Sequence, residues 1–120
     1  MINNWLATFK KGWTTKNIDL VLDLFAEDIR YWETPYQQLP DKAALRKEWE
    51  AARKQNNILL DLQLFASSGN KHTILWQLSY QNEKLELQNW AGTYLIELDA
   101  VGKCIYFHQT GEPRPGCTAP

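Results

Sequence analysis

The sequence contains little cysteine and histidine, with two of each in 120 residues. Cys104, Cys117, His72 and His108 stand far apart, without the close spacing of metal-binding motifs. We therefore predict no metal site and no cofactor. We also expect free thiols, because the chain carries no export signal that would place them in an oxidising compartment.

A long apolar run and a surplus of either charge are also missing. No stretch approaches the roughly 18 apolar residues that span a bilayer, and the amino terminus lacks the regions of a secretion signal. The net charge is -1, with Lys and Arg spread along the chain instead of gathered in a basic stripe. These absences argue against membrane insertion and nucleic-acid binding, and they predict a cytoplasmic protein.

Apolar and aromatic residues are abundant: 44% of the chain is hydrophobic, and six residues are tryptophans. A chain of this length buries roughly two thirds of its unfolded surface, which is enough for one core without staples. We expect one domain over residues 1–111. An extended tail over residues 112–120 should follow, because that segment has too much proline and glycine for a helix.

Helical spacing of apolar residues predicts three helices before the main run of strands. The first helix is capped by Asn3 or Asn4 and carries Trp5, Phe9 and Trp13 on one face, with Trp5 expected to be the most exposed.

The second helix spans about residues 18–25. The third follows Asp41, which caps it, and continues to about residue 56. Its apolar face carries Leu45, Trp49 and Ala52.

The strands are predicted from alternating apolar residues and from turn clusters. One strand, over residues 29–36, precedes the third helix, and Pro35 marks its end. Four strands joined by hairpins follow, over residues 58–66, 72–80, 85–98 and 104–110. Helices followed by an antiparallel meander indicate an α+β architecture.

The chain contains, in order, the segments F-K-K-G-W, D-L-F-A-E-D-I-R-Y-W-E-T-P, D-K-A-A-L-R-K-E-W and Y-L-I-E-L-D-A-V-G-K-C-I-Y-F. Their order and spacing resemble the nuclear transport factor 2-like superfamily, in particular its SnoaL-like and ketosteroid-isomerase-like members, from about Trp5 to Gly111. The resemblance implies a cone-shaped α+β barrel, in which three N-terminal helices pack against a strongly bent, mainly antiparallel sheet. The superfamily holds isomerases, epoxide hydrolases, dehydratases, cyclases and non-catalytic members, so it implies a pocket but no particular reaction.

The catalytic positions of the superfamily's enzymes are not matched. The resemblance places a carboxylate base just before the strand-ending proline and a tyrosine in the first helix, where this chain has Thr34 and Phe9. A threonine hydroxyl cannot act as a general base at neutral pH. Residues 72–81 contain none of the acids or arginines that an epoxide hydrolase would need. We expect no ketosteroid isomerase activity, and the reserve candidates for catalysis are Glu33, Tyr94 and Gln109.

Strand alternation and helical spacing select one set of side chains to line the cone. These ligand-binding candidates are Phe9, Trp13, Trp32, Thr34, Trp49, Trp76, Gln88, Trp90, Tyr94, Phe107 and Gln109. We expect Trp32, Trp76 and Trp90 to converge on one cavity. A shift of one residue in the first strand would turn Tyr31 and Glu33 inward in place of Trp32 and Thr34, and this register remains open.

Apolar walls with a few hydrogen-bonding groups are typical of small-molecule sites. We therefore expect a small-molecule-binding protein whose ligand is a mainly apolar, planar or cyclic compound. The alternatives are an isomerase, cyclase or dehydratase acting on such a compound, and a non-catalytic dimerising module whose cone is filled by tryptophans. We expect a homodimer in which a second copy covers the outer sheet face around Cys104, Tyr106 and His108.

Overall fold

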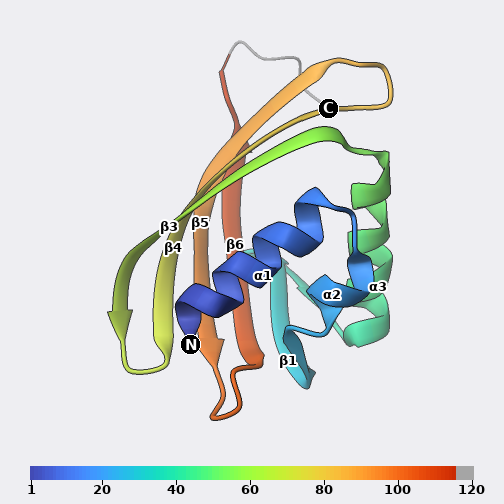
Figure 1. Ribbon diagram of the computed structural model, residues 1–120. Coiled ribbons are helices and arrows are strands. Elements are labelled where there is room, and N and C mark those ends of the chain that lie inside the picture. Colours follow the sequence, from blue (N-terminus) through green and yellow to red (C-terminus); the bar gives the residue numbers. More distant parts are fainter. Residues whose placement is uncertain (116–120) are drawn as a thin grey trace.

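The computed structural model describes residues 1–115 and combines helices with a single sheet (Figure 1). α1 spans Ile2–Thr14 and α2 spans Ile18–Leu22, whereas α3, at Lys42–Glu50, follows the first two strands and is extended by a 3-10 turn at Ala51–Lys54. Asn17 caps α2 and Asp41 caps α3, each by accepting a hydrogen bond from a backbone N–H three residues later.

The strands form one six-stranded sheet in the order β2-β1-β6-β5-β4-β3. Their bounds are β1 Phe25–Thr34, β2 Gln37–Leu39, β3 Asn56–Ser68, β4 Lys71–Gln81, β5 Leu87–Leu98 and β6 Cys104–Pro113. β1 pairs with β6 in parallel, and every other neighbouring pair is antiparallel. This is the expected α+β cone, with three helices packed against a bent, mainly antiparallel sheet.

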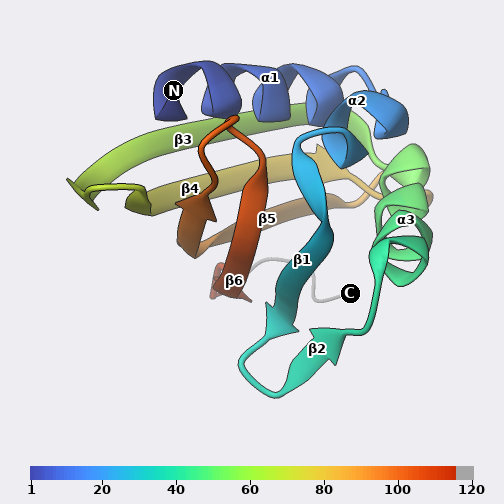
Figure 2. The ribbon, with the colours of Figure 1, turned by 90° about the horizontal axis from the view of Figure 1, so that it is seen from below.

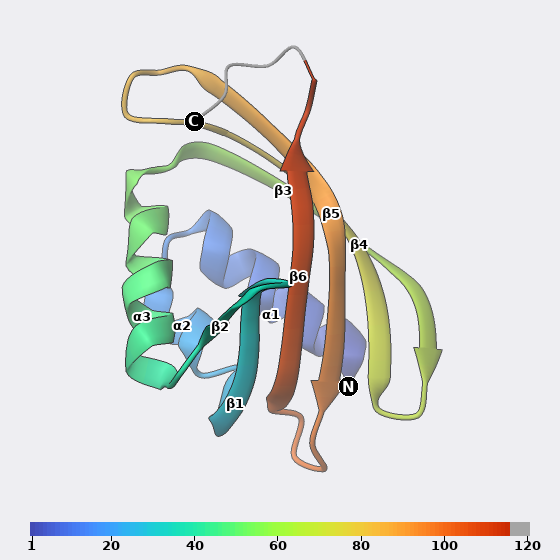
Figure 3. The ribbon, with the colours of Figure 1, turned by 180° about the vertical axis from the view of Figure 1, so that it is seen from behind.

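The helices all lie on the inner face of the sheet. α1 crosses that face, and α3 stands beside β1 and closes one side of the cone (Figure 2). From behind, the outer face of β6, β5 and β4 carries no helix (Figure 3). The molecule therefore has one face built around a core and one face of strands alone.

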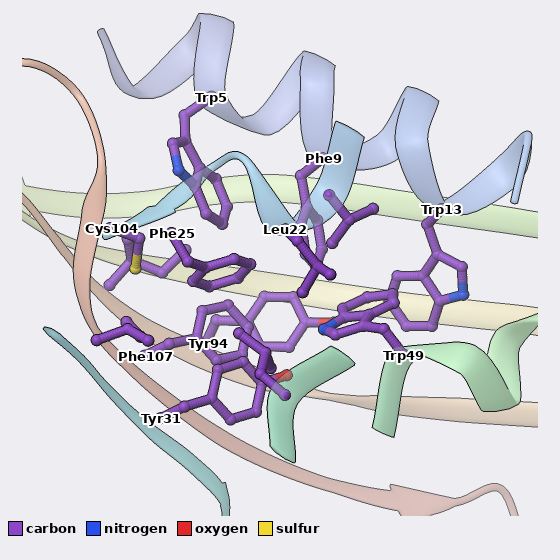
Figure 4. Packing of buried hydrophobic residues seen from close by; sticks show 14 of the residues in the cluster. Trp5, Phe9, Trp13, Leu22, Phe25, Tyr31, Trp49, Tyr94, Cys104 and Phe107 are labelled. Atoms are coloured by element: carbon purple, nitrogen blue, oxygen red, sulfur yellow. The ribbon is translucent and has the colours of Figure 1, made fainter. Parts of the chain in front are cut away.

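Aromatic rings from the helices and the sheet meet at the centre of the core (Figure 4). Phe9 on α1 is fully buried, and its ring contacts five others, those of Trp5, Trp13, Trp49, Tyr94 and Phe107. Edge-to-face and offset contacts of this kind are the favoured arrangements of aromatic pairs. The deep part of the cone is consequently filled by side chains.

Trp5 belongs to this core, so the expectation that it would be the exposed tryptophan is wrong. The side chain is only 3% exposed, and its indole N–H donates to the Leu24 carbonyl oxygen at 3.1 Å. α1 begins at Ile2, before the expected Asn3 or Asn4 cap, and this gives Trp5 a full helical turn on its N-terminal side.

The register of β1 is the second of the two that the sequence allowed. Tyr31 is 3% exposed and stacks on Phe107, whereas Trp32 lies on the other face beside His108. Thr34 is exposed, and its hydroxyl accepts a hydrogen bond from the backbone N–H of Tyr36. The expected inward placement of Trp32 and Thr34 is therefore wrong. The alternate residues of the strand, among them Tyr31, face the core instead.

Several element boundaries also differ from the sequence-based ones. β1 begins at Phe25, four residues earlier than predicted, and the short strand β2 was not predicted. A bulge at the start of β6 skips Ile105 in the pairing with β5 and turns Cys104 inward, fully buried. Cys104 is therefore absent from the outer face, where we expected it beside Tyr106. β6 continues to Pro113, and Cys117 lies outside the described residues.

Candidate functional site

A cavity of about 260 Å³ lies where α3 faces the inner side of the sheet. Six of the thirteen residues in its wall are aromatic, and the others are polar or aliphatic: Trp13, Tyr31, Glu33, Glu48, Trp49, Ala51, Ala52, Gln55, Trp76, Leu78, Tyr80, Trp90 and Gln109. The cone is thus filled at its centre and open beside α3. Larger depressions elsewhere on the molecule are lined by a higher share of exposed side chains.

Glu33 is the carboxyl group most strongly perturbed by this environment. Burial raises its pKa to about 7, and the nearby charge of Glu48 adds to the increase. Gln109 on β6 opposes the shift by donating a hydrogen bond to the Glu33 carboxylate, with 3.4 Å between Nε2 and Oε1. A carboxyl with this pKa is present in both protonation states near neutral pH, so it is able to accept or donate a proton.

Two buried phenols accompany Glu33. Burial, and then the charge of Glu33, hold the pKa values of Tyr31 and Tyr94 well above their ordinary value of 10.0. Both phenols therefore keep their protons at neutral pH and remain potential hydrogen-bond donors. The Trp49 side chain hydrogen-bonds to Tyr31, and this interaction acts in the opposite direction on the pKa of Tyr31.

Several buried polar atoms on the inner face have no hydrogen-bond partner among residues 1–115. They are the Tyr94 hydroxyl, the Trp76 indole nitrogen and both amide atoms of Gln88. Such groups lose their hydrogen bonds to water on folding and gain none in return, which is destabilising and calls for an explanation. A ligand or ordered water that formed hydrogen bonds with these atoms would compensate for that loss.

Trp76 is held flat against its neighbours. It stacks on Tyr94, with 5.3 Å between ring centroids and 13° between planes. On the other side its six-membered ring occupies the space that a Cβ atom at Gly111 would fill. The missing side chain at Gly111 therefore allows an indole to lie against β6 and form part of the cavity wall.

The candidates selected from the sequence fall into three groups. Five of them line the cavity together with Glu33, namely Trp13, Trp49, Trp76, Trp90 and Gln109. Four lie on the inner side but are buried behind or beside it, namely Phe9, Gln88, Tyr94 and Phe107. Trp32 and Thr34 lie away from the cavity, so only two of the three strand tryptophans converge on it.

The ligand-binding candidates chosen from the sequence lacked three wall residues, Glu48, Gln55 and Tyr80, and Tyr31 was expected there only in the alternative register of the first strand. All three had a detectable signal in the sequence. Glu48, Ala52 and Gln55 follow one another at helical spacing, so they share a face of α3 and its extension. Tyr80 continues the inward alternation of β4 that Trp76 and Leu78 begin.

The family model of the SnoaL-like domain matches residues 6–107 of the sequence. The chain belongs to the SnoaL-like domain family. No curated protein shows significant similarity to it. The match lies within residues 1–111, where we expected the domain.

Solved structures share the fold of this SnoaL-like domain at low sequence identity. The epoxide hydrolase/cyclase-like enzyme SalBIII, which takes part in pyran ring formation in salinomycin, matches with a TM-score of 0.80 and 12% identity, over 92% of this chain and 89% of the other. The Delta 5-3-ketosteroid isomerase from Mycobacterium sp. matches with a TM-score of 0.76 and 14% identity, over 89% of each chain. A Mycobacterium tuberculosis protein in complex with estradiol-17beta-hemisuccinate matches with a TM-score of 0.75 and 12% identity, over 88% of each chain.

Across residues 1–115, His, Cys, Asp and Glu side chains do not gather in groups of three or more that could hold a metal ion. In the same part of the chain, every helix is too short or too polar to cross a membrane.

Proposed function

We propose that this SnoaL-like domain binds a small, mainly apolar molecule in the cavity beside α3. The observation that carries the proposal is the composition of the wall, in which four indoles and two phenols surround a few polar groups. Rigid aromatic side chains around a few polar atoms are the usual make-up of ligand sites. Superfamily relatives with the same fold include a protein crystallised with a steroid derivative, and this supports a binding role for the cone.

The volume sets the size of the ligand. About 260 Å³ corresponds to roughly nine water molecules at liquid density and lies just below the usual range for drug-sized ligands. A compound with a single ring or a compact branched centre fits this space. The same volume argues against the interaction module with a filled cone, because that function requires no space beside Glu33.

Tryptophan fluorescence tests the binding proposal. Small ring compounds should quench or shift the emission of the folded protein with a saturable dependence on concentration. Trp90→Phe should weaken or alter this response because Trp90 lines the cavity. Trp32→Phe is the matched control, since Trp32 is also half-buried but lies on the outer face. Failure of a broad panel to produce any saturable response would contradict the proposal.

Proton transfer by Glu33 is a second candidate function, and the raised pKa of this residue favours it specifically. A carboxyl group with a pKa near the working pH, beside phenols that keep their protons, suits the removal and return of a proton next to a carbonyl group. The isomerase pattern put the base just before Pro35, at Thr34, whereas the carboxylate in the cavity is one residue earlier. We therefore propose Glu33 as the base and Tyr31, Tyr94 and Gln109 as neighbouring hydrogen-bonding groups.

Solvent exchange is the direct test of proton transfer. A cyclic ketone incubated with the protein in D2O should acquire deuterium next to its carbonyl faster than in buffer, as followed by NMR. Glu33→Gln should lower that rate by on the order of a hundredfold or more, the usual effect of losing a positioned base. Equal rates for both proteins would remove Glu33 from the mechanism and leave binding as the function.

We further propose that the protein is a cytoplasmic homodimer in which two copies of the outer sheet face pack together. Leu75 and Leu95 are exposed there, and Leu95 pairs with His108, two residues from Tyr106. Large apolar side chains on a bare sheet face form the kind of patch that a second copy covers.

A further inference from the structure

The charges around the cavity are of one sign. Among the described residues that line it, Glu33 and Glu48 are the only charged side chains, and no Lys, Arg or His takes part in the wall. Glu33 is largely buried and Glu48 is exposed at the rim of the cavity. No positive group within the wall balances the two carboxylates.

The aromatic wall has an electrostatic preference of the same kind. The face of an indole or phenol ring is electron-rich and attracts a cation within about 6 Å of the ring centre. Trp13, Trp49, Trp76 and Trp90 supply indoles to this wall, and Tyr31 and Tyr80 supply phenols. An anion placed in this cavity would be repelled by the two carboxylates and would gain no cation–π attraction.

We propose that the ligand of this cavity is a small organic cation, an alkylated ammonium ion held between the aromatic side chains with its positive charge facing Glu33 and Glu48. The proposal rests on the proposed binding function and specifies the chemical class of the ligand. It follows from the cavity, its aromatic wall and the sign of its charges. The repulsion between Glu33 and Glu48 is one reason for the raised pKa of Glu33, and a bound cation would relieve it.

An alkylated ammonium ion suits the wall better than a bare amine or a metal ion. A primary ammonium group needs several hydrogen-bond acceptors, but the Gln55 side-chain oxygen is already engaged by the Trp13 indole N–H at 2.8 Å. The Gln109 amide donates to Glu33 and so offers no free donor for an anion. Methyl groups on nitrogen spread the charge over an apolar surface, which matches the four indole rings of the wall.

The wall is also rigid before any ligand arrives. Trp76 is fixed between Tyr94 and Gly111, and Trp49 packs edge-on against Trp13, with 4.9 Å between ring centroids. Ordered side chains lower the entropy cost of binding, so a small cation is able to bind with few contacts.

The test compares two probes of the same shape. Choline carries a trimethylammonium group, and 3,3-dimethyl-1-butanol replaces its nitrogen by carbon without a charge. Calorimetry and tryptophan fluorescence at pH 8 should show choline binding at least tenfold more tightly than the neutral alcohol. Equal or tighter binding of the alcohol would overturn the cation proposal while leaving small-molecule binding intact. If neither probe nor any ring compound binds, both proposals fail.

Substitutions of the two carboxylates identify which of them interacts with the bound cation. Glu33→Gln should weaken choline binding at least fivefold, and Glu48→Gln should weaken it less because Glu48 is exposed and screened by solvent. Glu112→Gln, an exposed position on β6, is the matched control and should leave affinity unchanged. Unchanged choline affinity in both Glu33→Gln and Glu48→Gln, with folding verified by circular dichroism, would overturn the assignment of this cavity.

The pH dependence provides an independent readout. The titratable groups facing Glu33 are Glu48 from α3, Tyr31 from its own strand and Tyr94 from β5, and both phenols stay neutral up to pH 8. Choline affinity should therefore increase between pH 6 and pH 8 as Glu33 loses its proton. Glu33→Gln should remove this increase. A wild-type affinity that stays constant or falls over this range would contradict the proposal.

Discussion

Gln109 on β6 donates from one amide group toward two oxygens of Glu33 on β1, with 3.4 Å from Nε2 to both the backbone oxygen and Oε1. The pair joins the two parallel strands at the wall of the cavity. It partly offsets the effect of burial on Glu33 but does not cancel it, since the pKa remains raised to about 7. The free energy of unfolding should therefore depend on whether the Glu33 carboxyl is protonated.

Replacing Glu33 by Gln should remove one pH-dependent part of the folding free energy. A carboxyl whose pKa is higher in the folded state keeps its proton there while the unfolded chain loses it. Wild-type stability should therefore decrease, relative to Glu33→Gln, as pH rises from about 4.5 to about 7, by at most about 3 kcal/mol. Urea unfolding of both proteins across this range measures the difference. A difference that does not change with pH would show that the pKa of Glu33 is ordinary.

Tyr94→Phe should leave the stability of the protein unchanged or raise the free energy of unfolding by up to about 1 kcal/mol. The hydroxyl is buried without a hydrogen-bond partner in the described part of the chain, so its removal eliminates a desolvation cost without breaking a hydrogen bond there. Thermal and urea unfolding provide the measurement. Tyr94→Leu serves for comparison, because it also removes ring contacts with Phe9, Trp76 and Phe107 and should be clearly destabilising. A loss of more than about 1 kcal/mol in Tyr94→Phe would indicate a bound partner for the hydroxyl.

Gly111→Ala should displace Trp76 and reshape the cavity. The new methyl group would overlap the six-membered ring of the indole, and overpacking of this kind costs about 1–3 kcal/mol. We expect lower stability and a changed tryptophan emission spectrum. Thr110→Val is the control, since it alters the neighbouring, exposed residue of the same strand. Similar spectra and stabilities for Gly111→Ala and wild type would mean that Trp76 does not lie against β6.

Leu95→Glu should convert the proposed dimer to monomers. Leu95 is 43% exposed on the outer face, and a two-fold contact would bring two new carboxylates into one interface, where burying unpaired charge is costly. Light scattering of the purified proteins measures the mass. Val101→Glu, at an exposed turn, should leave the mass unchanged. A wild-type monomer at micromolar concentration would contradict the dimer.

The order of the elements and the core faces of the helices followed from the sequence because their patterns are long and regular. Trp49 and Leu45 share a helical stripe with polar residues around it, and Ile74, Trp76 and Leu78 alternate with exposed residues. Burial enforces such patterns strongly, since a shift would expose every member at once.

The register of β1 could not be decided from the sequence because both of its faces carry large aromatic side chains. Tyr31 and Trp32 are adjacent, so either parity would bury one ring. The choice follows from contacts with distant residues, namely the stacking of Tyr31 on Phe107 and the burial of Ile29. The bulge that turns Cys104 inward has no local signature either, because it results from pairing with β5. Glu33 lies in the cavity because β1 adopts the register in which Tyr31 points inward.

The parallel pairing of β1 with β6 determines when the cavity is able to form. β1 is made early in synthesis and reaches its place in the sheet only beside a strand that ends at Pro113. Glu33 and Gln109 are separated by 76 positions, so their contact closes a long loop, and contacts of this kind form slowly. Until the last strand arrives, Phe25 and Tyr31 lack Phe107 as a partner, and the nascent chain exposes apolar rings that invite aggregation. Chains interrupted before residue 104 should therefore depend on chaperones to stay in solution.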